Sequence, residues 1–136
     1  MEIIEKKLKQ LEKTVLTLKK VIELESKNTD PENIHRDAKI KRFEYTSELF
    51  WKFLKIYLER IHGVKAATPK SAYREALIAE IISPEETKQC IKMVETRNMT
   101  SHLYNEDIAQ KIALEVNEYF VLIHTITKRI SQALTK

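Results

Sequence analysis

The fold is decided first by residues 4–22, IEKKLKQLEKTVLTLKKVI, in which apolar residues return at alternating spacings of four and three. The repeating positions are Ile4, Leu8, Leu11, Val15, Leu18 and Ile22. Lysine and glutamate fill most of the remaining positions, so the stretch predicts a helix with one apolar face. Asn28-Thr29-Asp30-Pro31 follows it, and we expect Asp30 to cap the next helix with Pro31 in its first turn.

The second segment, residues 31–62, is apolar over a much wider arc. One stripe contains Ile34, Ala38, Tyr45 and Leu49, another contains Phe43, Phe50, Leu54, Tyr57 and Ile61, and Trp51, Phe53, Ile56 and Leu58 nearly close the circle. A helix that is apolar on most sides must be covered on most sides, by other helices or by a partner chain. We therefore expect this helix to be central, with Gly63 as its left-handed C-cap.

Three further helix starts can be read along the rest of the chain. Thr68-Pro69 opens a short helix over residues 69–82, and Ser83-Pro84-Glu85-Glu86 has the pattern of a capping box for a helix that runs to about Arg97. Residues 98–104 have no helical repeat and predict a connection. Asn105-Glu106-Asp107 can cap and charge the last helix, whose expected core stripe is Ile108, Ile112, Val116, Tyr119, Ile123, Ile126, Ile130 and Leu134.

These elements predict an all-α protein, an antiparallel up-and-down four-helix bundle with one extra short helix, in a single domain over residues 1–136. The composition agrees, because one glycine in 136 residues is too few for a dinucleotide fold, a phosphate-binding loop or a hairpin-rich β fold. The lone Cys90 excludes an internal disulfide and suits a reducing compartment. We find no secretory leader and no membrane span, and expect a cytoplasmic protein.

The net charge of +4 is carried by the first half of the chain, with 15 Lys and Arg against 11 Asp and Glu over residues 1–65. Arg36, Lys39 and Arg42 belong to a basic cluster that is a candidate contact for an RNA backbone. The alternative is an ordinary solvated helix face, which composition alone favours.

The candidate for chemistry is Arg97-Asn98-Met99-Thr100-Ser101-His102-Leu103-Tyr104, which lies at a junction between helices. The guanidinium of Arg97 suits phosphate, and His102 can take a proton near neutral pH. Together they would cleave RNA without a metal, His102 acting on the 2′-hydroxyl and Arg97 stabilising the charge on phosphorus, with Asn98 and Ser101 orienting the pair.

A structural interpretation competes with this one. In it, Arg97 complements the dipole at a helix C-terminus and His102 is a hydrogen-bonding residue of a loop. We interpret His62 and His124 as structural residues. No HExxH or Cys/His ligand spacing is present, so we expect neither a protein-built metal site nor a cofactor.

Three blocks of this sequence together resemble the HEPN superfamily, and more closely the nucleotidyltransferase substrate-binding proteins. They are residues 42–52, residues 68–76, and the Arg-x4-His-x-Tyr motif of Arg97, His102 and Tyr104. The resemblance covers nearly the whole chain. It implies a helical bundle that forms a homodimer beside a minimal nucleotidyltransferase, with ribonucleolytic residues at Arg97 and His102 and an adenylyl acceptor at Tyr104.

The leading hypothesis is therefore the toxin of a toxin–antitoxin pair, a metal-independent endoribonuclease that adenylylation of Tyr104 silences. The alternative is a non-catalytic subunit that holds nucleotide or substrate for a two-component nucleotidyltransferase, with Arg97 and His102 contacting phosphate but breaking no bond. A third hypothesis is a scaffold bundle in which the motif is incidental.

Overall fold

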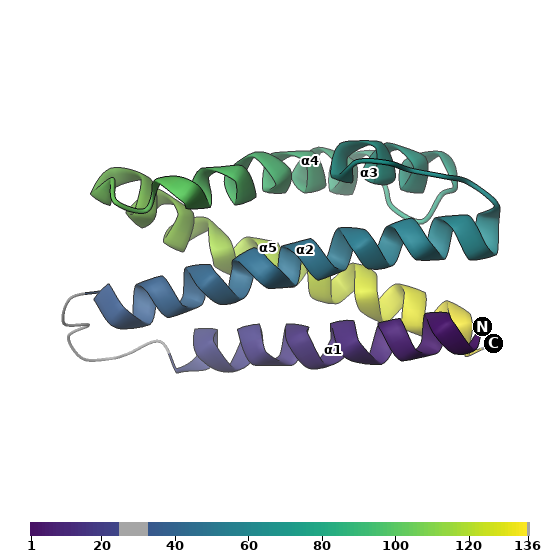
Figure 1. Ribbon diagram of the computed structural model, residues 1–136, viewed down its shortest axis with the longest axis horizontal. Helices are drawn as coiled ribbons and strands as arrows, with labels where there is room; N and C mark the ends of the chain where they lie inside the picture. The colour runs from purple at the N-terminus through teal and green to yellow at the C-terminus, as the bar shows by residue number, and fades with distance from the viewer. Residues whose placement is uncertain (25–32, 136) are drawn as a thin grey trace.

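The computed structural model describes residues 1–24 and 33–135, and within them the chain forms the expected antiparallel helical bundle (Figure 1). The helices are α1 (Glu2–Glu23), α2 (Ile34–His62), α3 (Pro69–Ile78), α4 (Pro84–Asn98), the 3₁₀ helix η2 (Met99–His102) and α5 (Glu106–Leu134). The long helices alternate in direction along the chain, and the N-terminus lies beside the C-terminal end of α5. The predicted cap at Asp30 and Pro31 falls outside the described residues.

The first helix packs as its repeat predicts. The five buried apolar residues of α1 are Ile4, Leu8, Leu11, Val15 and Leu18, and Ile22 is partly buried against the same core. Every third or fourth residue is therefore in contact with α2 and α5, while the lysines and glutamates face solvent. The apolar spacing of this stretch is enough to determine which face is buried.

The second helix is central, as expected, because it packs against α1, α3, α4 and α5. Phe43 and Phe50 are fully buried in it, and Phe43 stacks on Tyr119 of α5 with ring centroids 5.4 Å apart. The stripe that begins at Ile34 is not covered by the other described helices, since the side chain of Ile34 is 65% exposed and Tyr45 on the same face is also exposed. Of the two predicted kinds of cover, other helices or a partner chain, only the partner chain is left for this face among the described residues.

The predicted caps that fall within the described residues are present, with small differences in helix length. Gly63 ends α2 at φ 67° and caps it with backbone hydrogen bonds, a conformation that glycine adopts without a steric penalty. Thr68 and Ser83 each form a capping box, at α3 and α4. The short helix stops at Ile78 instead of residue 82, and the expected connection 98–104 contains the one-turn η2.

One hydrophobic cluster includes residues of all five α-helices. Cys90 lies within it, and burial raises the pKa of its thiol to about 12, so this cysteine is an unreactive core residue. None of the described helices is long and apolar enough to cross a membrane. The packing places η2 at one end of the bundle, between the last turn of α4 and the first turn of α5.

Candidate functional site

The motif residues lie at the corner where α4 gives way to η2 and α5. Local hydrogen bonds fix the backbone of this corner: Thr100 Oγ1 donates to the carbonyl of Arg97 at 2.7 Å, and Ser101 Oγ donates to the carbonyl of Asn98 at 3.2 Å. Thr100 is buried, whereas Asn98 and Ser101 are exposed. The hydroxyl of Ser101 therefore supports the backbone of the turn, and among the described residues no hydrogen bond joins it to His102.

His102 and Tyr104 are brought together on the surface of this corner. The Nδ1 atom of His102 lies 3.1 Å from the Tyr104 hydroxyl, and the two rings meet edge to face with centroids 5.8 Å apart. Both side chains are exposed, Tyr104 to 83%. A large aromatic side chain so exposed, with its hydroxyl beside an imidazole nitrogen, is accessible to another molecule.

Arg97 belongs to the same corner but turns toward α2. Its guanidinium Nη2 lies 4.0 Å from Oε2 of Glu48, and its side chain is 32% exposed. Glu48 also pairs with Lys52 at 3.4 Å, and the buried Nε of Arg97 has no hydrogen-bond partner among the described residues. Within the same part of the chain, no hydrogen bond joins Arg97 to His102.

A second carboxylate of α2, that of Glu44, is affected by the charge of Arg97. Burial alone would raise the pKa of Glu44, but the nearby Thr100 hydroxyl, the hydrogen bond from Lys41 and the charges of Lys41 and Arg97 together lower it. Glu44 thus stays ionised near the guanidinium. Sequence reasoning missed both Glu44 and Glu48, because a glutamate one turn from another on a long helix has no distinguishing signal.

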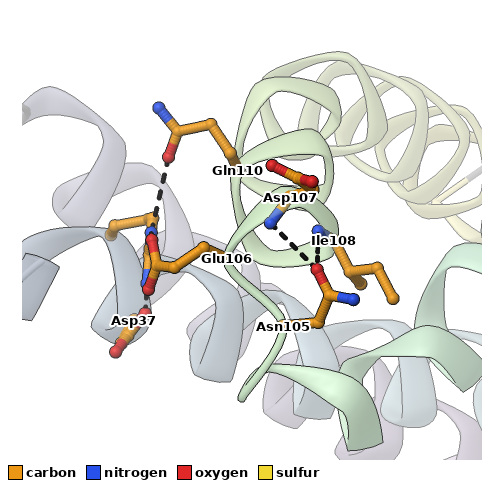
Figure 2. A network of polar contacts seen from close by, with 7 residues as sticks. Asp37, Asn105, Glu106, Asp107, Ile108 and Gln110 are labelled. Carbon is orange, nitrogen blue, oxygen red and sulfur yellow. Dashed lines mark hydrogen bonds and ion pairs between the residues drawn. The ribbon is translucent and has the colours of Figure 1, made fainter.

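The basic cluster of α2 is placed differently from the prediction. Arg36 is only 8% exposed and binds Glu106 of α5 through both terminal nitrogens, at 2.8 and 3.2 Å, while its Nε donates to Asp37 at 3.0 Å (Figure 2). Lys39 is 4% exposed, and Arg42 is partly buried. Since carboxylates already occupy the guanidinium of Arg36, neither this residue nor the buried Lys39 is available to an RNA backbone.

The Arg36–Glu106 pair holds the start of α5 directly after the corner. Gln110, one turn further along α5, accepts a hydrogen bond from Nη1 of Arg36 at 3.4 Å. Figure 2 shows Asn105 capping the same helix by accepting from the backbone of Asp107 and Ile108. The sequence pattern assigned Glu106 to the helix dipole alone. Its partner lies 70 residues away, and no local pattern predicts a pair at that separation.

On the other face of α4, a buried hydroxyl network anchors the residue before Arg97. Thr96 Oγ1 lies 2.8 Å from the Tyr119 hydroxyl, and both Thr96 and Tyr119 hydroxyls lie 3.0 Å from Oε2 of Glu115. Burial, with a contribution from Glu115, raises the pKa of Tyr119 to about 12, so the phenol stays neutral and donates to the carboxylate. The sequence did not predict this network, because it joins residues of two different helices.

The remaining histidines lie away from the corner. His35 Nε2 is 2.7 Å from the carbonyl of Val21, which links α2 to α1. His62 lies against Tyr57 at the end of α2, and His124 stacks on Phe120 with ring centroids 5.6 Å apart. In the described part of the chain, no group of three His, Cys, Asp or Glu residues is arranged to hold a metal ion.

Fold and corner together define a small all-α protein whose polar surface motif lies at one end of a helical bundle. The chain belongs to the family described as nucleotidyltransferase substrate binding protein like, whose model matches residues 6–132. None of the curated proteins matches it by sequence.

Two solved structures are similar to the chain. A protein of Thermus thermophilus is 36% identical, with a TM-score of 0.80 over 88% of this chain and 97% of that one. A Haemophilus influenzae protein, whose structure is described as revealing the fold of a substrate binding domain of a nucleotidyltransferase, is 19% identical, with a TM-score of 0.65 over 96% of this chain and 98% of that one. At this identity the second likeness shows the fold alone.

Proposed function

We propose that this protein is the non-catalytic substrate-binding subunit of a two-component nucleotidyltransferase. The family match over residues 6–132 carries the proposal. The Haemophilus protein, described as a substrate binding domain of a nucleotidyltransferase, supports it by its shared fold. The partner is a minimal nucleotidyltransferase, which supplies the catalytic carboxylates and binds its metal.

The corner formed by Arg97, His102 and Tyr104 is the part of the surface that this subunit presents to the partner. Tyr104 is 83% exposed, and its hydroxyl has His102 as a neighbour at 3.1 Å. Arg97 is one-third exposed, and its buried Nε has no partner among the described residues. A guanidinium with one long contact to a carboxylate retains donors for the phosphate of a substrate.

Co-purification and calorimetry with a minimal nucleotidyltransferase test this proposal. The partner to use is the product of the neighbouring reading frame, provided that this frame carries a Gly-Ser…Asp-x-Asp motif. The Tyr104→Ala variant should bind the partner at least about tenfold more weakly, the loss typical of an aromatic residue at the centre of an interface. Leu114→Ala, a change at a similarly exposed apolar residue on α5, is the matched control and should bind normally. Unchanged binding of Tyr104→Ala would contradict the role of the corner.

A second candidate function is that of a HEPN toxin, a metal-independent endoribonuclease. The contact between His102 Nδ1 and the Tyr104 hydroxyl favours it, because it places a proton acceptor beside an exposed phenol. In adenylylation, the Tyr104 oxygen would attack the α-phosphorus of ATP, pyrophosphate would leave, and the phenol proton would pass to the imidazole or to water. The new phosphodiester would place an anion close to His102 and compete with RNA.

In RNA cleavage, His102 would take the proton of a 2′-hydroxyl, the 2′-oxygen would attack phosphorus, and the 5′-oxygen would leave with a proton from solvent. Arg97 would stabilise the negative charge on the phosphorane. Because the single chain does not join Arg97 to His102, this mechanism needs a homodimer or a movement of the guanidinium toward the imidazole.

Two assays separate the candidates. Incubation of the chain with RNA and EDTA should give fragments with 2′,3′-cyclic phosphate ends if it is a ribonuclease, and His102→Ala should abolish them. Incubation with the partner, ATP and Mg²⁺ should add an adenylyl group that Tyr104→Phe prevents. Intact RNA together with tight binding of the partner supports the binding subunit. If Arg97→Ala and His102→Ala changed neither binding nor any activity, the chain would be a scaffold.

A further inference from the structure

The other side of α5 carries a groove that the corner does not use. It lies between α1 and α5 and has a volume of about 330 Å³, within the size range of small-molecule sites. Its lining residues are Glu12, Val15, Leu16, Lys19, His124, Thr127 and Lys128. The groove lies about 30 Å along α5 from Glu106, since each helical residue adds about 1.5 Å. It is therefore separate from the motif.

The walls of this groove hold an excess of positive charge. Lys19 comes from α1 and Lys128 from α5, so ammonium groups line both sides, against the single carboxylate of Glu12. Among the residues that the structure describes, neither lysine takes part in an ion pair. Two cations without a carboxylate partner, on opposite walls of one groove, favour an anionic ligand.

A similar groove between α4 and α5 differs in its charge balance. Its volume is about 370 Å³, and it also contains one lysine from each helix, Lys92 and Lys111. Glu95 and Glu115 line the same space and balance them. Size and lysine count are therefore shared by both grooves, and the net charge distinguishes the groove on the α1 side.

The floor of the groove on the α1 side contains a buried polar group without a partner. Thr127 is 3% exposed, and its Oγ1 makes no hydrogen bond with the described residues. In a helix a threonine hydroxyl commonly bonds the carbonyl one turn before it. Buried hydroxyls are nearly always satisfied, so an unsatisfied one beneath a groove indicates a place for a polar atom of a ligand or a water.

The α5 side of the groove also contains a planar ring, the imidazole of His124. His124 is exposed, stacks on Phe120 with ring planes 24° apart, and lines the same groove as Lys128. Val15 and Leu16 give the opposite wall an apolar surface. A ligand that fits both features has an anionic group at one end and a planar ring at the other.

We propose that the groove between α1 and α5 binds a mononucleotide, with its phosphate between Lys19 and Lys128 and its base against His124. The inference rests on the groove alone. Its test needs neither the partner nor RNA, so it can fail while the proposed function stands, and the reverse also holds.

The test is calorimetric titration of the whole chain with AMP, ribose 5-phosphate, inorganic phosphate and adenosine. AMP should bind more tightly than ribose 5-phosphate, and adenosine should not bind measurably. Amide chemical shifts of the ¹⁵N-labelled wild-type protein should move at α1 and α5 residues of the groove on addition of AMP. Equal affinity for AMP and inorganic phosphate, no binding of AMP at millimolar concentration, or shifts confined to the Arg97–Tyr104 corner would each overturn the proposal.

Variants then assign the parts of the ligand. Lys19→Gln with Lys128→Gln should weaken binding of AMP and ribose 5-phosphate by about tenfold or more, as expected for two lost charge-assisted contacts. His124→Ala should weaken AMP but not ribose 5-phosphate. The matched control, Lys92→Gln with Lys111→Gln in the α4–α5 groove, should leave both affinities unchanged. An equal loss in the two double variants would show non-specific attraction and overturn the site.

Discussion

Two arginines of this protein, Arg36 and Arg97, differ in their exposure to solvent and in their carboxylate partners. Arg36 is 8% exposed, binds Glu106 through two nitrogens and Asp37 through the third, and ties the start of α2 to the start of α5. Arg97 is one-third exposed, has one carboxylate at 4.0 Å, and leaves its Nε unpaired within the described residues. The sequence offered both side chains as candidate contacts for phosphate.

The difference teaches that carboxylate partners determine whether an arginine is structural or free to bind a ligand. A guanidinium whose five donors are largely used in fork geometry has little left for a phosphate. One with a single distant partner keeps its donors, and the nearby Glu44 and Glu48 only bias its position. Arg36 thus ties α2 to the start of α5 next to the corner, and Arg97 keeps free hydrogen-bond donors at the surface of the corner.

The largest expected effect comes from replacing Arg97. Arg97→Ala should lower RNA cleavage by roughly 10²–10³-fold, if the chain is a ribonuclease, because the charge on phosphorus loses its stabilising donor. The thermal midpoint should stay within about 1 °C, since Glu48 keeps Lys52 as a partner. Cleavage and calorimetry on the same preparation measure both. If Arg97→Ala lowered the thermal midpoint strongly but cleaved RNA normally while folded, Arg97 would be the structural arginine, and the comparison with Arg36 would be wrong.

Arg36→Met should give the opposite pattern. The methionine keeps the apolar part of the side chain but removes the link between α2 and α5, so we expect the thermal midpoint to fall by roughly 2–5 °C. Partner binding at the corner should decrease only slightly at temperatures where the variant is folded. Arg42→Met, a change at a partly buried arginine further along α2, is the control. A fall in the thermal midpoint no larger than that of Arg42→Met would contradict a stabilising role for the Arg36–Glu106 pair.

The hydroxyl network beside Arg97 gives a smaller effect. Tyr119→Phe removes one hydroxyl but leaves Thr96 bonded to Glu115 at 3.0 Å, so the free energy of unfolding should fall by about 1 kcal/mol. Urea unfolding measures it. Tyr57→Phe, at another buried tyrosine, serves as the reference. A fall of several kcal/mol in the free energy of unfolding would mean that the hydroxyl network, and not the Arg36–Glu106 pair, stabilises the corner.

The smallest effect is a dependence on acid pH. The hydrogen bond and charge of Arg36 lower the pKa of Glu106 below its ordinary value of 4.5. A carboxylate with a lowered pKa in the folded state stabilises the protein above that ordinary value, and this stabilisation disappears as the pH falls through the lowered pKa. The stability difference between wild type and Glu106→Gln should therefore be fully present above the ordinary pKa of 4.5 and should shrink as the pH falls through the lowered pKa. A difference that persists in acid would exclude the charge of Glu106 as its source.

The fold could be predicted from sequence in most of its parts. The spacing of Ile4 to Leu18 determined the buried face of α1, and Ser83 with Glu86 indicated the start of α4, because both signals act over one or two turns. Gly63 was predicted for the same reason. For the stripe at Ile34 and Tyr45, apolar character indicated a need for cover but not whether another helix or a partner chain provides it, and no other described helix covers this stripe.

For the candidate site, too, local features could be predicted from the sequence and long-range contacts could not. By itself, the sequence determined that Arg97 lies at the end of one helix and that His102 and Tyr104 follow in the junction before the next helix, since their spacing is local. Only the tertiary structure decided that Arg36 belongs to Glu106, that Arg97 turns toward Glu48, and that Lys19 and Lys128 share a groove. Those partners lie tens of residues apart, and the packing of the helices determines which charges meet and which stay free for another molecule.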